Sequence, residues 1–282
     1  MTRVVSRRSA PVVVALLVLC LAAVSFAQRG RYRRGRYEDY LTQGRPDRRG
    51  VPDWKLDQDF QRDVFTFVRI RYSSYGRWGW QTDYPDADLN FSYRLQQLTS
   101  MHVDPDGVVL DLTDPRLFDY PFIYIIEPGH IALSQAEQEA LRTYLLNGGF
   151  LMVDDFWGED EWYNFYTELR EIFPDREPVE LPLEHPVFHC VYDLKERPQI
   201  PAIGWAQQGA AYGITWERED AREVHYKGLF DDNGRMMAII CHNTDLGDGW
   251  EREGEDPWYF REFSEKKAYP LGINIVFYAL TH

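Results

Sequence analysis

The chain has 282 residues, of which 15% are aromatic, and it carries a formal net charge of -14 at pH 7. This length suits one domain with a sizeable core behind a targeting segment. The acidic balance argues against nucleic acid as a partner, because phosphates would be repelled.

The first residues have the order of a secretory signal. Arg3, Arg7 and Arg8 precede a long uncharged apolar run, which closes on small residues at Ala27. We therefore predict a signal peptide over residues 1–27 and export to the periplasm or cell envelope, with no transmembrane span once the signal is removed. A retained membrane anchor is the alternative, because the apolar run approaches the length of a short span.

The next segment, residues 28–52, is rich in arginine and glycine. It includes "RGRYRRGRYEDY", which has no apolar periodicity and cannot bury enough surface to offset its ordering entropy. We expect a disordered tether that meets anionic envelope components, or a solvated tail with no partner.

A globular domain is predicted over residues 53–282. It opens with a strand, "VFTFVRIRY", from Val64 to Tyr72. A helix through "LNFSYRLQQLTSM" follows, which Asp86 or Asp88 can cap, and "VVLDL" is a second short strand.

The clearest unit is a strand, a helix and a strand. "FIYIIEPGH" is an apolar strand that stops at a proline and a glycine, "SQAE" at 134–137 has capping-box spacing, and "NGG" ends the helix before the strand "FLMVDD". Short links of this kind predict a right-handed parallel crossover, with the strands that begin at Phe122 and Phe150 as neighbours. Another helix is expected from Glu161 to Phe173.

The C-terminal part adds a hairpin and a closing helix. "EVHYKGLF" and "RMMAIICH" flank "DDNG", which predicts an antiparallel pair. "PLGINIVFYALT" places Pro270 at a first helical position and is apolar nearly all round, as in a buried helix. The fold class is therefore α/β, three-layered, with a mostly parallel sheet and an added antiparallel hairpin.

Several stretches of the chain resemble the bacterial family called domain of unknown function 4159. They include "TDYPDADLNFSYRLQQLTS", "YLLNGGFLMVDDFWG", "HPVFHCVYDL" and "ICHNTDLGDGW", and they run in order from Phe65 to His282. The resemblance implies a flavodoxin-like architecture similar to that of class I glutamine amidotransferases. It implies no activity.

The residues argue against glutamine hydrolysis. An amidotransferase needs a cysteine nucleophile on a tight turn after a central strand. The equivalent turn here is Glu127, Pro128, Gly129 and His130, and it has no cysteine. Cys190 and Cys241 could form a disulfide, although Cys241 ends an inner strand and a buried free thiol is favoured there.

Polar residues follow the predicted strands, where ligands of open α/β sheets collect. The candidates at these strand ends are Glu127, His130, Asp154, Asp155, His242, Asn243 and Asp245. Either aspartate of the adjacent pair could be a general base or metal ligand, or could cap the following helix. "CHNTDLGDGW" is rich in oxygen ligands but lacks the order of an EF-hand loop, so calcium is a weak indication beside an Asn- and Asp-bonded turn.

The stretch "EHPVFHC" places His185 and His189 four positions apart. If extended, the two imidazoles would lie about 13 Å apart, too far to share one ion. We expect a cleft wall or core histidines there, and a metal site using His185, His189 or Asp154 is the lesser option. Tryptophans near loops could form an aromatic rim or belong to the core, namely Trp78, Trp80, Trp157, Trp205 and Trp250.

Two functions remain open at this point. The first is a non-enzymatic envelope module whose acidic, aromatic-lined cleft binds a small molecule, glycan or envelope protein, with no cofactor expected. The alternative is a metal-assisted or acid/base hydrolase that uses Glu127, His130, Asp154 and His242.

Overall fold

The computed structural model describes residues 48, 50–56, 63–75 and 79–282. The predicted signal peptide, most of the tether and Trp78 lie outside these residues. The described compact unit begins at Arg48, whose Nη1 lies 2.8 Å from Asp106 Oδ1. None of the helices in the described part is both long and apolar enough to cross a membrane.

A seven-stranded sheet forms the centre of the domain, in the order β4-β2-β5-β6-β9-β8-β7, and β1 and β3 form a separate pair. The strands are β1 (Val64–Phe65), β2 (Val68–Arg71), β3 (His102–Val103), β4 (Val108–Asp111), β5 (Phe122–Ile126), β6 (Phe150–Asp154), β7 (Val179–Glu180), β8 (His225–Phe230) and β9 (Met236–His242). The first five strands in this order, β4, β2, β5, β6 and β9, pair in parallel. Strand β8 pairs antiparallel with both of its neighbours, β9 and β7. The predicted α/β class, mostly parallel sheet and hairpin are confirmed.

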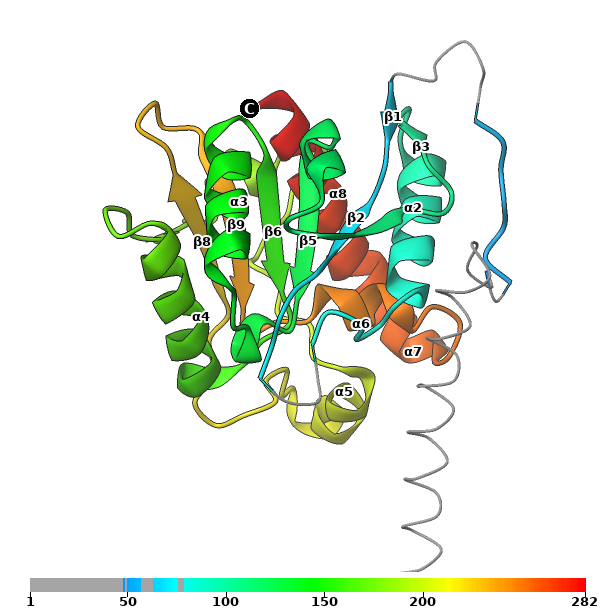
Figure 1. Cartoon of the computed structure of the whole chain (residues 1–282). Helices are drawn as coiled ribbons and strands as arrows, with labels where there is room; N and C mark the ends of the chain where they lie inside the picture. The colour runs from blue at the N-terminus through cyan, green and yellow to red at the C-terminus, as the bar shows by residue number, and fades with distance from the viewer. Residues whose placement is uncertain (1–47, 49, 57–62, 76–78) are drawn as a thin grey trace, which may run out of the picture. The chain divides into compact units, whose positions relative to one another are not determined.

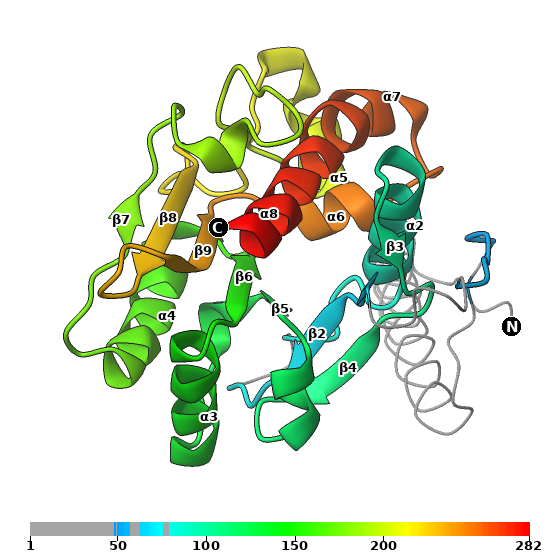
Figure 2. The ribbon, with the colours of Figure 1, turned by 90° about the horizontal axis from the view of Figure 1, so that it is seen from above.

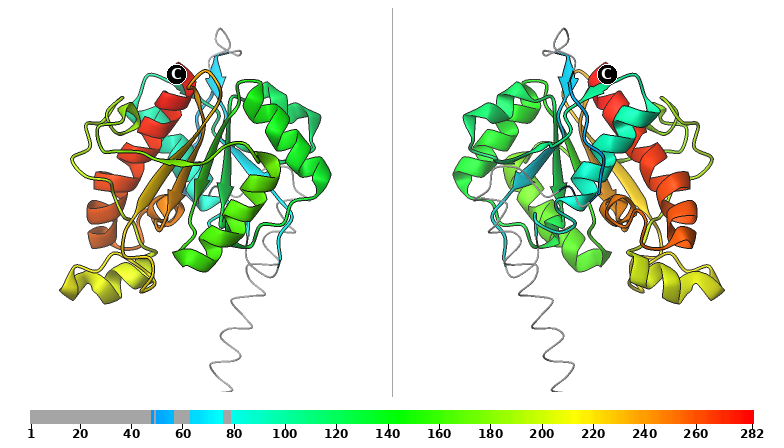
Figure 3. Two further views of the ribbon diagram at one scale, coloured as in Figure 1. Left: turned by 90° about the vertical axis from the view of Figure 1, so that its left-hand side faces the viewer. Right: turned by 90° about the vertical axis from the view of Figure 1, so that its right-hand side faces the viewer.

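Helices cover both faces of this sheet, which gives three layers (Figures 1 and 2). Helices α3 and α4 lie on one face, and α2, α6 and α8 lie on the other, as the side views in Figure 3 also show. Their bounds are α2 (Asp86–Leu98), α3 (Gln135–Leu146), α4 (Gly158–Ile172), α5 (Ile203–Gly209), α6 (Leu246–Glu251), α7 (Pro257–Tyr259) and α8 (Tyr269–Thr281). Because both faces are covered, successive residues of the central strand β5 are buried and serve two cores: Ile123 and Ile125 face α3, whereas Tyr124 and Ile126 face α8.

The crossover from β5 to β6 forms as predicted. The two strands are parallel neighbours, with Phe122 opposite Phe150. The capping box is also confirmed: Ser134 Oγ accepts from the Glu137 amide at 3.4 Å, and Glu137 Oε2 accepts from the Ser134 amide at 2.8 Å. These local signals therefore place α3 over the sheet.

Three local predictions need correction. The first predicted strand divides into β1 and β2, which belong to different sheets. Helix α2 begins at Asp86 without a side-chain cap, because Pro85 occupies the N-cap position and Asp88 binds Arg69. Helix α4 begins at Gly158 rather than at Glu161.

The closing helix is buried as predicted, but it does not begin at its proline. A π-helix, η6 (Phe260–Ala268), leads directly into α8, where Pro270 is the second residue. The irregular turns of a π-helix tolerate such an interruption of the regular hydrogen-bond ladder.

Candidate functional site

The order of the strands reverses between β2 and β5, which makes this point of the carboxyl edge the topological switch point of the sheet. The chain leaves β2 toward α2 on one face, and it leaves β5 toward α3 on the other. In open α/β sheets ligands bind at such a switch point.

Backbone strain gathers at the same edge. Among the described residues other than glycine, positive φ angles occur at Asp83 (61°), Glu127 (49°), Asp155 (57°) and Asn243 (62°). The last three directly follow β5, β6 and β9, and Asp83 lies in the connection from β2 to α2. Non-glycine residues in this conformation are uncommon and concentrate at functional sites.

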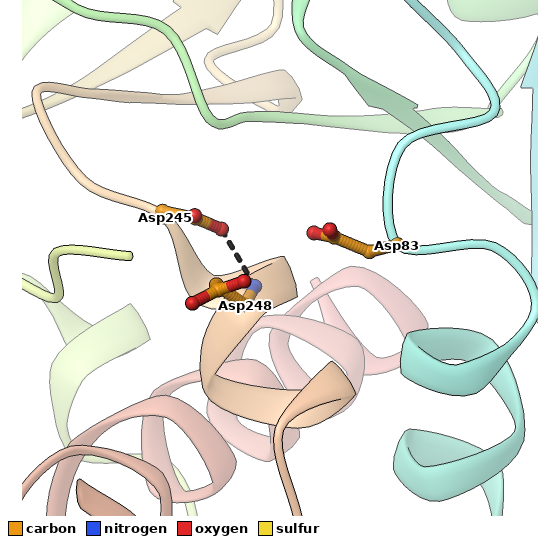
Figure 4. Close-up of side chains that lie close together, drawn as sticks. All are labelled: Asp83, Asp245 and Asp248. Atoms are coloured by element: carbon orange, nitrogen blue, oxygen red, sulfur yellow. Dashed lines mark hydrogen bonds between the residues drawn. The ribbon is translucent and has the colours of Figure 1, made fainter. Parts of the chain in front are cut away.

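Three buried aspartates meet at this edge, and we call them the aspartate cluster. One carboxylate oxygen from each of Asp83, Asp245 and Asp248 lies within 4.8 Å of the other two. Figure 4 shows Asp83 reaching from the segment before α2 toward the other two, which come from the start of α6. Two segments that are far apart in the sequence therefore build one acidic site.

Arg69 on β2 positions the segment that carries Asp83. Its Nη1 donates to the carbonyls of Trp80 at 2.9 Å and Thr82 at 2.8 Å, and its Nε donates to Asp88 at 3.0 Å. The guanidinium is fully buried and lies over the Tyr124 ring. A buried side chain with several hydrogen bonds thus holds the backbone just before Asp83.

The two aspartates of α6 are held by the helix start and its neighbours. Asp245 Oδ1 accepts from the Asp248 amide at 2.6 Å and caps α6. Asp248 accepts from the Ile203 amide at 2.6 Å and from Arg252 Nε at 3.0 Å. Asp245 is therefore fixed by the start of its own helix, and Asp248 by donors outside the cluster.

Asp83 differs from these two. Its Oδ2 is buried and has no hydrogen-bond partner among the described residues. A Cβ added to Gly247 would lie 2.7 Å from this oxygen, so the glycine leaves room for the carboxylate. Apart from a proton that Asp83 can share with the Glu251 carboxyl, an oxygen in such surroundings lacks compensation from the protein.

Further carboxyl groups surround the cluster. Burial raises the pKa of Asp154 to about 7, although Tyr124 and the Gly247 amide each donate to its Oδ2 at 3.0 Å. Burial also raises the pKa of Glu251 to about 7, and burial followed by the carboxylates of Glu251 and Asp248 raises that of Asp83. Since like charges oppose ionisation at close range, this edge favours uptake of protons or of a cation.

The structure brings several predicted residues to this edge. Glu127 and Asp155 follow their strands directly, and burial together with Glu127 raises the pKa of Asp155. His130 lies on the turn η3 (Pro128–His130) with an exposed side chain. Together with Asp154 and Asp245, these residues form the part of the site that the sequence predicted.

His242 and Asn243 lie at the same edge but stabilise the α4 face. His242 Nε2 donates to the Gly158 carbonyl at 3.1 Å, and its ring packs on Phe156 at 4.7 Å. Burial lowers the pKa of His242 to about 4, which keeps the imidazole neutral. Asn243 accepts from the Gly158 amide at 2.9 Å and donates to the Glu223 carbonyl at 2.7 Å.

The histidines of "EHPVFHC" lie elsewhere. His185 Nδ1 accepts from the Val187 amide at 3.3 Å, and its ring lies 5.4 Å from that of Tyr278 near the end of α8. His189 uses both ring nitrogens, one toward Asp193 at 2.6 Å and one toward the Leu183 carbonyl at 2.7 Å. The C-terminus lies at the end of the sheet opposite the arrowheads of β5 and β6 (Figure 1), so this loop does not join Asp154.

Other predicted features divide between core and surface. Trp250 and Trp157 are buried, Trp80 is half-buried and Trp205 is exposed. Cys190 and Cys241 are both free thiols, so the disulfide does not form.

Sequence reasoning missed Asp83 and Asp248. Asp248 belongs to the oxygen-rich stretch "CHNTDLGDGW", which carried a weak calcium signal. Asp83 gave no signal of its own, because it lies in a segment interpreted only as the approach to a helix.

A comparison with known families now decides the relationship. The sequence model of a domain of unknown function (DUF4159) matches residues 66–280. The chain belongs to this family. The DUF4159 domain includes β2 to β9 and all three members of the aspartate cluster. No curated protein matches the chain.

The DUF4159 domain of this chain also lacks the thiol of an amidotransferase at the turn after β5. That turn is Glu127 to His130, as expected. Cys241 lies within β9, where burial raises the pKa of its thiol well above the usual range. Such a thiol is a poor nucleophile, because the thiolate is the reactive form.

Proposed function

We propose that this protein is an exported, non-enzymatic binding module of the periplasm or cell envelope. Its ligand, a small molecule, a glycan or an envelope protein, binds at the acidic carboxyl edge of the sheet through a positively charged group. The observation that carries the proposal is the gathering of buried carboxyl groups there, which Arg69 and Arg252 neutralise only in part.

Two observations on the described residues at this edge support binding rather than catalysis. The turn after β5 offers no thiol, and His242 is held neutral against Gly158. A catalytic histidine must exchange a proton near the working pH, which a buried imidazole with a pKa of about 4 does poorly.

Export rests on the N-terminal sequence. Its charged, apolar and small residues follow the order of a secretory signal. N-terminal sequencing of protein from a periplasmic fraction should begin at Gln28. Recovery of the chain only from the cytoplasm, with Met1 or Thr2 first, would contradict this part of the proposal.

Ligand binding is tested by calorimetric titration with charged probes. Spermidine, a lysine-rich peptide and glucosamine oligomers should include binders whose affinity falls with added salt, whereas neutral glucose oligomers should bind weakly. Asp155→Asn should weaken binding, and Asp160→Asn, at an exposed position in the first turn of α4, should leave it unchanged. Equal affinity for neutral and cationic probes would overturn the proposal.

A hydrolase, metal-assisted or acid/base, is the second candidate, and one observation favours it. Asp154 has a pKa of about 7 and a buried Oδ1 that no described residue bonds, as a general base at neutral pH would. Turnover of ester, amide or glycoside substrates that disappears in Asp154→Asn would replace the binding module by this enzyme.

A further inference from the structure

We infer that Asp83, Asp245 and Asp248 bind a single divalent cation through their carboxylate oxygens. This inference rests on the proposed use of the carboxyl edge for binding. It proposes that the positive charge bound at this edge is that of a metal ion. The aspartate cluster itself supplies the three ligands, each from a buried side chain.

The spacing of the three carboxylates suits one ion. Calcium and magnesium bind oxygen at about 2.0 to 2.6 Å, so two ligands of one ion lie at most about 5 Å apart. The three oxygens lie within 4.8 Å of one another. Three carboxylate oxygens at this spacing could therefore hold one ion.

The carboxylate of Asp83 gives independent support. Only 5% of this residue is exposed, and its Oδ2 has no hydrogen-bond partner among the described residues. Figure 4 shows this carboxylate pointing toward Asp245 and Asp248. A cation at this point satisfies the uncompensated oxygen and removes the repulsion between the three carboxylates.

The surrounding structure positions the ligands in advance. Arg69 fixes the carbonyls of Trp80 and Thr82 just before Asp83, and the Ile203 amide and Arg252 fix Asp248. None of these donors uses the free oxygen of Asp83. Outer contacts that orient ligands in this way are a regular part of metal sites.

The ligand atoms select the class of cation. All three are carboxylate oxygens, and hard ions such as Mg²⁺, Ca²⁺ and Mn²⁺ prefer oxygen, whereas zinc and copper sites favour imidazole and thiolate. Three aspartates leave the remaining coordination positions to water or to an oxygen of a bound molecule. The site would therefore link the metal to a second, oxygen-bearing ligand.

The test uses the full chain after removal of its signal, dialysed against a chelator. Calorimetric titration with MgCl₂, CaCl₂ or MnCl₂ should give one ion per chain for at least one metal, with a rise in melting temperature. Asp83→Asn should weaken this affinity at least tenfold. Its free oxygen makes it the variant that disturbs the fold least, and Asp160→Asn serves as the matched loss of one exposed carboxylate from the same edge.

A second variant keeps all three carboxylates. Gly247→Ala places a methyl group 2.7 Å from the Asp83 oxygen and should displace it from the ion. Metal affinity should fall while the circular dichroism spectrum is retained. This variant decides the question if Asp83→Asn does not fold.

The possible failures are distinguishable. If no metal binds but spermidine or the lysine-rich peptide does, the metal inference is wrong and the proposed binding function stands. If none of these probes binds, both are wrong. If metal binds equally to Asp83→Asn, Gly247→Ala and the unaltered protein, the ion occupies another place and the inference is overturned.

Discussion

Two groups of buried charges lie on the same face of the sheet, and they are arranged in opposite ways. Arg69 and Asp88 form a closed pair, in which the guanidinium donates to the carboxylate and to two backbone carbonyls. The aspartate cluster gathers three carboxylates of like charge, and within the described part of the chain an oxygen of Asp83 has no hydrogen-bond donor. The pair is electrically complete within the protein, whereas the cluster needs a proton or a cation.

This difference separates structural charges from functional ones. Burial alone does not identify a site, because both groups are equally withdrawn from water. The distinguishing feature is whether the protein supplies every partner. His189 follows the same rule, since both of its ring nitrogens are bonded within its own loop.

Breaking the closed pair should have the largest effect. Arg69→Met leaves Asp88 buried without its cation, so we expect the free energy of unfolding to fall by about 3 to 5 kcal/mol. Urea denaturation measures this change. Arg71→Met, which removes the half-exposed pair with Asp111 from the same strand, should cost at most about 1 kcal/mol. Equal losses in the two variants would show that the buried pair has no special role.

A buried neutral imidazole should give a smaller, pH-dependent effect. The pKa of His242 is about 4, below its ordinary value of 6.5, because burial opposes its charge. The unfolded chain therefore takes up the proton first, and the stability contributed by His242 is lost as the pH falls from 6.5 toward 4.

Comparison with a variant isolates this contribution. Relative to His242→Phe, the unaltered protein should lose about 2 to 3 kcal/mol between pH 7 and pH 4.5, as measured by urea denaturation. His225, Lys227 and Asp220 face the same ring and are retained in both proteins. Parallel stability profiles for the two proteins would contradict the lowered pKa.

Removal of a carboxylate from the aspartate cluster should raise the stability of the protein rather than lower it. In metal-free buffer at pH 7, Asp83→Asn removes one of the three mutually repelling groups, so we expect stability to rise by about 1 to 2 kcal/mol. Thermal and urea unfolding measure this gain. Asp88→Asn, the same change in the closed pair, should lower stability. A loss in both variants would mean that Asp83 is structurally satisfied.

Glu137 provides the smallest test, because it is a buried carboxylate satisfied without any cation. It accepts from the Ser134 amide at 2.8 Å and from the Ser73 amide at 3.3 Å. Ser134→Ala removes the hydroxyl that caps α3 and should cost about 1 kcal/mol. Ser134→Thr should retain most of the stability. A neutral result for Ser134→Ala would show that backbone amides alone satisfy this end of the helix.

The crossover from β5 to β6, the hairpin of β8 and β9 and the buried closing helix followed from the sequence alone. Their signals are local: a capping box at Ser134, glycines after α3, and a turn between two apolar runs. Each signal acts through backbone geometry within a few residues, so no knowledge of distant contacts is needed.

Only the tertiary structure decided which polar residues form a site. Asp83 and Asp248 are far apart in the chain and meet because β2 lies beside β5 and α6 packs against α2. The same arrangement directs Asp88 to Arg69, places His242 against α4 and leaves His185 near the end of α8. The sequence determined the polar character of these positions, but their partners depend on strand order and loop course, because a carboxylate or imidazole acquires its role from the groups that surround it in space.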